Sequence, residues 1–394
     1  MKPATSTLFA TGALAFASVL SATVLIPVVR PIMHWVAPDG DSGSHAFMSL
    51  NLLGGVLAAP VIARLGRRSS SPTRLVSRLA FADCALLLLI AFRLPVVPLL
   101  ILRTVQGALN VGVLSTLLGA APPGDASRRG SRYGLWGMAM MLGVALGAPL
   151  GTICLLLGVR APLLASALLN LLVGLCAPLA GLQRQNPLGA EASRKPSFGR
   201  AAWWVFAERF SVGLFVVTFA LHARTCLGIS DARCGLLFTA FLVPFAVAVY
   251  PAGRAADRFD GRVLAVLGLS AYGAGFLRLR ATGQEQLLLL MPLLGLSAAV
   301  IFASAMRDAA TANDSQSRVP AMSALNAAGN LGMLLGTALA GILSALLRAR
   351  GAGADTAHTL VFYIGGGVSL SVAAVTLSGA LLAPRVARSV RVRS

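Results

Sequence analysis

Long uninterrupted apolar runs are the feature that most constrains this chain. The first, LFATGALAFASVLSATVLIPVV at residues 8–29, is typical, and runs of similar length recur throughout the sequence. An α-helix needs about 20 apolar residues to cross the hydrocarbon core of a bilayer. The strands of a transmembrane β-barrel are about half as long and alternate in polarity. The sequence therefore predicts an all-α, polytopic membrane protein.

Composition agrees with this class. Of the 394 residues, 57% are hydrophobic and only 12% are charged. About a quarter of the residues of a soluble domain are charged, so this chain lacks the polar side chains that cover a water-facing surface. The net charge is +20, but the basic residues lie in short turns between the apolar runs and form no basic face. We therefore expect no nucleic acid partner.

Turn residues and charges divide the apolar runs into twelve predicted transmembrane helices. They lie near residues 6–29, 45–63, 75–93, 95–121, 133–157, 161–182, 201–222, 233–253, 262–280, 284–306, 320–347 and 356–383. The longest loop, residues 182–200, is polar, basic and rich in Gly, Pro and Ser, as linkers are. It divides the chain into two six-helix bundles, residues 1–181 and 201–394.

Lysine and arginine are distributed unequally between the two sides of these spans. With the N-terminus on one side, 22 of the 33 lysines and arginines fall on that side and nine on the other. Positive residues collect in cytoplasmic loops. We therefore expect both termini to be cytoplasmic, together with the segment GRAADRFDGR (253–262), predicted as a turn between spans eight and nine.

The two halves repeat each other. APVIARLGRR (59–68) precedes span three and AGRAADRFDGR (252–262) precedes span nine, so Arg64 aligns with Arg258. In the same way LGVALGAPLG (142–151) in span five aligns with LGMLLGTALAG (331–341) in span eleven, which pairs Gly143 and Gly147 with Gly332 and Gly336. These matches indicate two pseudo-symmetric copies of a six-helix unit, an architecture that recurs in secondary transporters.

The chain resembles the major facilitator superfamily over its whole length. The family's signature after span two is Gly-x-x-x-Asp-Arg-x-Gly-Arg-Arg/Lys. The second half approximates it, with one extra residue, through Gly253, Asp257, Arg258, Gly261 and Arg262. The first half keeps Arg64, Gly66, Arg67 and Arg68 but has Ala59 and Ala63 in place of the first Gly and the Asp.

In the family, such charge clusters latch the inner side shut while the outer side is open. The resemblance therefore implies two contacts between the halves. We expect Asp257 to meet the start of span five near Ser131 and Arg132, because a carboxylate is stabilised at a helix N-terminus. We also expect Arg64 or Arg67 to meet Asp308 or Asp314.

Two further motifs fall in the spans where the family has them. Span four matches Arg-x-x-Gln-Gly through Arg103, Gln106 and Gly107, and in the family this Arg lies on a cavity-lining helix and is implicated in proton handling. Span five approximates Gly-x-x-x-Gly-Pro-x-x-Gly-Gly of the drug antiporters through Gly143, Gly147, Pro149 and Gly151. A glycine strip with a proline permits close helix packing and bending. This motif favours export over import.

Four charged residues lie well inside the spans: Asp83, Arg103, Glu208 and Arg209. Charges in a membrane are costly and mark ion or substrate pathways. Span seven lines the central cavity in this family, so Glu208 is our first candidate for the proton-coupling acid, with a structural pair to Arg209 as the alternative. Asp83 and Arg103 lie at similar depth on consecutive helices and are predicted to pair.

We expect a proton-coupled exporter of drugs or of hydrophobic and amphiphilic metabolites, acting as a monomer in a bacterial inner membrane and without a cofactor. Two alternatives in the same fold are an uptake porter for a small organic solute and a carrier of lipid or lipid-linked substrates. No nucleophile–base set, phosphate loop or metal-ligand spacing indicates an enzyme or a metal site. Cys226 and Cys234 fall near one outer loop, either as a disulfide or as two thiols.

Overall fold

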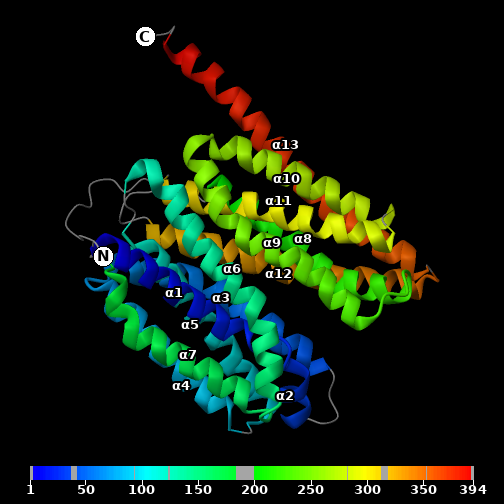
Figure 1. Cartoon of the computed structure of the whole chain (residues 1–394), viewed down its shortest axis with the longest axis horizontal. Helices are drawn as coiled ribbons and strands as arrows, with labels where there is room; N and C mark the ends of the chain where they lie inside the picture. The colour runs from blue at the N-terminus through cyan, green and yellow to red at the C-terminus, as the bar shows by residue number, and fades with distance from the viewer. Residues whose placement is uncertain are drawn as a thin grey trace.

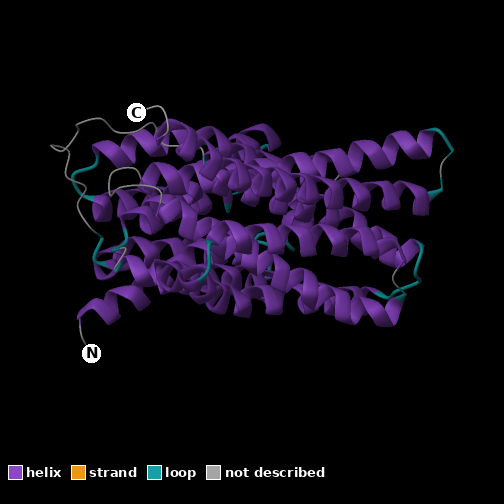
Figure 2. Cartoon of the chain, turned by 90° about the horizontal axis from the view of Figure 1, so that it is seen from above, coloured by secondary structure: helices purple, strands orange, loops and turns teal. Residues whose placement is uncertain are grey.

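The computed structural model describes residues 3–36, 42–92, 94–122, 125–182, 199–281, 283–311, 318–351 and 353–391, and every regular element in them is a helix (Figures 1 and 2). The first half contains α1 (Pro3–Thr23), α2 (Val29–Val36), α3 (Ser42–Arg68), α4 (Pro72–Ile90), α5 (Val96–Ala120), α6 (Arg129–Leu155) and α7 (Ala161–Cys176). The second half contains α8 (Arg200–Thr225), α9 (Asp231–Arg258), α10 (Gly261–Arg278), α11 (Gln284–Thr311), α12 (Arg318–Ala349) and α13 (Ala354–Arg391). Most of the predicted linker lies outside the described residues.

Twelve of these helices correspond to the twelve predicted spans, and α2 is an additional short helix. Within the described residues, ten helices are long and apolar enough to cross a membrane. The other two, α4 and α10, are 19 and 18 residues long and are the third span of each half. α4 packs between α5 and α7, and α10 packs between α11 and α13. The polytopic, all-α class is thus confirmed.

Two predicted boundaries are wrong. α1 ends at Thr23 rather than near residue 29. The Thr23 hydroxyl lies against the Gly143 carbonyl of α6 (2.9 Å), and Pro27 lacks the N–H that a continuing helix would need. α9 continues through GRAADR to Arg258, so the predicted ten-residue turn contains only Phe259 and Asp260 between helices.

The helices of the two halves pack in the same pattern. α1 lies against α6 and α7, and α8 lies correspondingly against α12 and α13. α3 lies against α5 as α9 lies against α11, and α4 lies against α7 as α10 lies against α13. Equivalent neighbours at every position confirm that the fold contains two copies of one six-helix unit.

The predicted glycine strips occupy equivalent places in this pattern. On α6, Gly143 and Gly147 face α1, Gly151 faces the residues just after it, and a Cβ at Gly143 would lie 2.9 Å from the Phe16 carbonyl oxygen. On α12, Gly332 and Gly336 face α8, and a Cβ at Gly332 would lie 2.5 Å from the carbonyl oxygen of Phe206. Each strip therefore lets two helix backbones approach more closely than any larger residue would permit. Pro149 lies on the exposed side of α6, which continues past it to Leu155.

The interface between the halves is formed mainly by α6 against α9 and by α12 against α3, with further contacts from α11 to α6 and from α12 to α5. Both termini lie at one end of the molecule, which we call the terminal end (Figure 1). The two bundles lie close together there and separate toward the opposite end, the far end (Figures 1 and 2).

Candidate functional site

Asp257 joins the two halves at the terminal end. Its carboxylate accepts hydrogen bonds from the Gly130 N–H (2.6 Å), the Ser131 N–H (2.8 Å) and the Ser131 hydroxyl (2.6 Å). These groups begin α6, so the carboxylate occupies the positive end of that helix's dipole. The contact predicted near Ser131 is confirmed, whereas the Arg132 side chain donates to the Pro122 carbonyl (3.2 Å).

Gly253 of α9 lies one helical turn before Asp257 and packs against α6, the helix that Asp257 contacts. A Cβ on Gly253 would lie 2.8 Å from the Cα of Gly134, and a Cβ on Gly134 would lie 3.0 Å from the Cα of Gly253. α6 and α9 therefore meet backbone to backbone, which requires glycine on both helices. This contact brings the start of α6 within reach of the Asp257 carboxylate.

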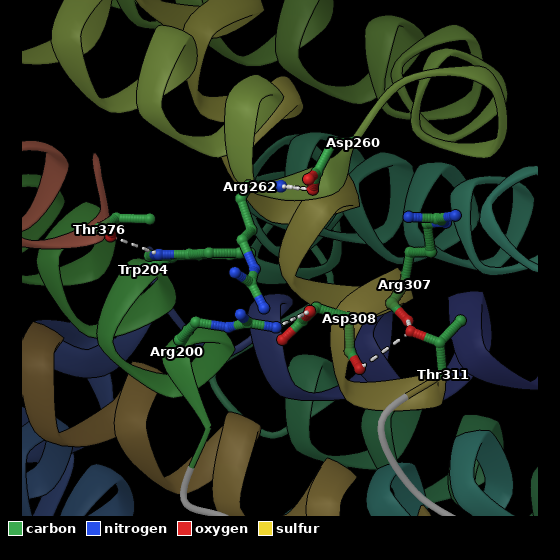
Figure 3. Close-up of polar contacts among 8 residues, drawn as sticks. All are labelled: Arg200, Trp204, Asp260, Arg262, Arg307, Asp308, Thr311 and Thr376. Carbon is green, nitrogen blue, oxygen red and sulfur yellow. Dashed lines mark hydrogen bonds and ion pairs between the residues drawn. The ribbon is translucent and has the colours of Figure 1, made fainter. Parts of the chain in front are cut away.

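The arginines of the second-half motif have different positions. Arg258 is exposed at the end of α9. Arg262 donates its backbone N–H to Asp260 (2.8 Å), which caps α10 (Figure 3). The basic group near Asp257 comes from α11 instead, since Arg307 Nε lies 4.0 Å from the carboxylate.

The first-half copy of the motif also lies at the interface between the halves, but no carboxylate takes part in its contacts among the described residues. Ala63 stands where the second half has Asp257, and Gly66 of α3 packs directly on Val319 of α12. The Ser323 hydroxyl donates to the Ala59 carbonyl (3.1 Å). The Arg318 guanidinium donates to the carbonyl of Ala121 at the end of α5 (3.3 Å). Among the described residues, only the second-half copy of the motif therefore places a carboxylate across the interface between the halves.

The predicted contact of Arg64 or Arg67 with Asp308 is wrong. Asp308 pairs with Arg200 at the start of α8, at 3.0 Å (Figure 3). Arg64 and Arg67 are exposed on the last turns of α3, and Asp314 lies outside the described residues. Arg67 and Asp308 do line a common, largely apolar cavity of about 530 Å³ bordered by α3, α8 and α12.

Asp83 and Arg103 belong to one buried network but are not directly paired. Gln106 stands between them: the Arg103 guanidinium donates to its side-chain oxygen, and its side-chain N–H donates to the Asp83 carboxylate (3.4 Å). Asn170 of α7 donates to the same carboxylate oxygen (3.0 Å), and Asn51 of α3 donates to Gln106 (2.8 Å). The network therefore ties α3, α4, α5 and α7 together inside the first half.

Asn51 and Asn170 were not predicted from the sequence, which pointed to Gln106 through a motif and otherwise to charged residues inside the spans. A lone amide in an apolar run is the signal that would have found them, because a buried amide needs hydrogen-bond partners.

Arg103 is 2% exposed, and its guanidinium also lies 4.6 Å from the centre of the Phe47 ring.

Glu208 and Arg209 of α8 face different surroundings. The Arg209 guanidinium lies over the rings of Phe245 (5.8 Å) and Phe302 (5.7 Å), and its Nη2 donates to the Met141 sulfur (3.7 Å). Met141 belongs to α6 of the other half. The side chain that faces the interface between the halves is therefore Arg209.

Glu208 lies behind Arg209 and is fully buried. One of its carboxylate oxygens is 3.2 Å from Arg209 Nε, but the angle is too bent for a hydrogen bond, and neither oxygen has a hydrogen-bond partner among the described residues. Tyr272 of α10 lies within electrostatic range, and its hydroxyl is likewise buried without a partner there. Glu208 thus reaches the interface only through Arg209.

Comparison with known proteins identifies the family. The model of the Major Facilitator Superfamily matches residues 7–205 and again residues 201–393, once for each half. The chain therefore belongs to this superfamily and is a multi-pass secondary transporter, not an enzyme.

Among solved structures, the human organic anion transporter MFSD10 (TETRAN) is similar, with a TM-score of 0.72. The match is 15% identical in sequence and covers 95% of this chain and 100% of that chain. At this identity the likeness shows the fold alone. No curated protein matches this chain in sequence.

Proposed function

We propose that this chain is a proton-coupled exporter of amphiphilic organic solutes, acting as a monomer by alternating access in a bacterial inner membrane. The observation that carries the proposal is the pair Glu208–Arg209, which places one cation at the interface with a buried carboxylate directly behind it. The glycine strip of α6, which resembles that of drug antiporters, supports the direction of transport.

The surroundings of Arg209 suit an amphiphile. Phe245, Phe302 and Met141 supply apolar contact surface, and the guanidinium supplies directed N–H donors for one polar group of a substrate. Binding sites for small molecules commonly combine an apolar lining with a few polar groups that fix orientation. We therefore propose a neutral or zwitterionic solute with a large apolar part.

The same pair supplies a route to proton coupling. The Glu208 carboxylate forms an ion pair with Nε of Arg209. Nη2 of the same guanidinium points toward the other half, where it contacts Met141. Protonation of Glu208 removes the charge that positions the guanidinium, so a proton weakens the substrate site. Substrate and proton then occupy the transporter alternately, which is the requirement for antiport.

A second candidate, uptake of an organic anion together with a proton, is favoured by the same geometry if the substrate carries a net negative charge. An anionic substrate bound to Arg209 would neutralise the positive charge that faces Glu208. A buried carboxylate without a counter-charge is costly, so Glu208 would then bind a proton, and substrate and proton would be carried together.

Transport into everted membrane vesicles tests the proposal. Vesicles energised to an acidic, positive interior should accumulate one or more members of a panel of lipophilic antibiotics and dyes, and a protonophore should abolish the uptake. Glu208→Gln should lose this proton-driven uptake. Glu285→Gln makes the same chemical change at an exposed position on α11 and should transport normally. Uptake that is equal in Glu208→Gln and wild type would contradict the coupling role.

A further inference from the structure

Three side chains with metal-binding atoms meet at the far end of the second half. His222 lies in the last turn of α8, Cys226 ends that helix, and His358 lies in the second turn of α13. One ligand atom from each lies within 4.8 Å of the other two. Cys226 Sγ and His358 Nδ1 are 3.8 Å apart, and the two imidazole rings meet edge to face with centroids 5.7 Å apart.

The surroundings of His222 support a ligand-binding role for this cluster. It is 2% exposed, yet neither of its ring nitrogens has a hydrogen-bond partner among the described residues. A buried imidazole without a partner is costly, and the cost disappears if one nitrogen binds a ligand. Its Nδ1 lies 4.0 Å from the carboxylate of Asp355, which is 56% exposed in the first turn of α13. A carboxylate oxygen therefore lies next to His222, at the edge of the three-residue cluster.

The backbone holds the cluster in place. The Cys226 N–H donates to the His222 carbonyl (2.9 Å), so the two residues are one helical turn apart on the same face of α8. The chain then turns at Gly228, whose φ of +63° favours glycine, and the Ile229 N–H donates back to the Ala223 carbonyl (2.8 Å). Gln284 donates to the Leu227 carbonyl (2.6 Å). Cys226 is therefore fixed relative to His222 before any ligand binds.

We propose that His222, Cys226 and His358 form a Zn²⁺ site, and that the exposed Asp355 side chain rotates toward it to supply the fourth ligand. Two imidazoles, a thiolate and a carboxylate are the donors that zinc takes in tetrahedral sites. Zn–S and Zn–N bonds of about 2.3 and 2.0–2.1 Å place a sulfur and a nitrogen ligand about 3.6 Å apart in a tetrahedron. The separation of 3.8 Å between Cys226 Sγ and His358 Nδ1 is close to this value, so these two ligands need only small adjustments. The His222 imidazole lies within 4.8 Å of both and must move closer on binding.

The site would fasten α8 to α13 at the far end. These two helices are already joined at the terminal end, where Trp204 donates to Thr376 (2.9 Å; Figure 3). They are joined again at mid-height, where the Ser211 hydroxyl donates to the Gly365 carbonyl (2.9 Å). A metal ion would add a third junction between these helices. Arg209 lies on the same helix, α8, about 20 Å from His222.

Metal binding by the purified full-length protein tests the site. Metal-free protein titrated with Zn²⁺ should bind one ion per chain, and Co²⁺ used as a spectroscopic substitute should give the visible bands of tetrahedral coordination and a thiolate-to-metal charge-transfer band. Cys226→Ser should abolish the charge-transfer band, and His358→Ala should abolish stoichiometric binding. Asp355→Asn should weaken Zn²⁺ binding about 10- to 100-fold, as loss of a neighbouring carboxylate does in other zinc sites.

Two controls separate this site from adventitious binding. Cys234→Ser removes a thiol near the same end, and His34→Ala removes a histidine of the other half; both should bind Zn²⁺ like wild type. Zn²⁺ should also raise the unfolding temperature of wild type but not of Cys226→Ser. The proposal is overturned if Co²⁺ gives no thiolate band, or if Cys226→Ser and His358→Ala together bind Zn²⁺ as wild type does.

Discussion

Replacing Asp257 by alanine removes the carboxylate that joins α9 to the start of α6. The carboxylate accepts three hydrogen bonds from Gly130 and Ser131, and its side chain is 8% exposed. Hydrogen bonds to charged groups contribute about 1.5–3 kcal/mol each at most, and loss of a helix-capping carboxylate alone costs about 0.5–2 kcal/mol. Because water replaces part of what is lost, we expect about 2–3 kcal/mol in total.

Opening of the terminal end would separate Asp257 from Gly130 and Ser131, so we expect the whole of this loss to fall on the closed conformation. A change of about 2–3 kcal/mol shifts the equilibrium between closed and open terminal ends by about 30- to 150-fold. A transporter that rests mainly closed at this end would thus become mixed or mainly open. The substrate affinity measured from each side of the membrane would change with it.

Distance measurements between spin labels can detect this shift. Labels on Ser127 and Phe259, exposed residues of opposite halves at the terminal end, should report one short distance in the wild-type background with its five cysteines replaced. Asp257→Ala should add a population at longer distance. Asp260→Ala is the matched control, because Asp260 caps α10 within the second half. Identical distance distributions in all three proteins would refute the latch.

Three further predictions follow from the packing and from the buried groups. Gly253→Leu should prevent closure of the terminal end and stop transport, whereas Gly341→Leu, on an open helix face, should have little effect in the same transport assay. Gln106→Leu should lower the unfolding free energy by about 1–3 kcal/mol, because it leaves buried polar partners unsatisfied; a melting curve like wild type would contradict the bridging role. Arg209→Lys should keep the charge but lose the planar fork of donors, so substrate binding should weaken by more than tenfold, and an unchanged dissociation constant would exclude Arg209 from the site.

Much of the architecture could be predicted because it follows from local patterns. Apolar run length gave the twelve spans, and the paired glycine strips gave the repeat. The contact of Asp257 with Ser131 was also predictable from the family resemblance. The motif places a carboxylate near the end of one helix, and in that family the N-terminus of a helix of the other half lies opposite it.

Side-chain partners depended on tertiary packing and were less predictable. Several arginines lie near Asp308 at the terminal end, and the choice of Arg200 over Arg67 depends on where α3 and α8 end and how they are rotated. Gln106 separates Asp83 from Arg103 because an uncharged amide at the right register intervenes. In the His222–Cys226–His358 cluster, His222 and Cys226 are one helical turn apart, but His358 follows Cys226 by 132 positions, so no local spacing connects all three.

Similarly, composition and span order placed Glu208 and Arg209 in the same helix at the centre of the molecule but did not show which of them faces the other half. Adjacent residues on a helix point about 100° apart. The contacts of Arg209 with Met141, Phe245 and Phe302 show that Arg209 faces the other half, and Glu208 lies behind it.

The most direct test of the coupling claim is the proton stoichiometry of substrate binding. A substrate identified in the vesicle assay is added to purified transporter in weakly buffered detergent solution, and an indicator dye reports the change in pH at several starting values. The account predicts proton release on substrate binding by wild type and by Glu285→Gln, and none by Glu208→Gln. Proton uptake by wild type, or release that persists in Glu208→Gln, would contradict antiport through the Glu208–Arg209 pair.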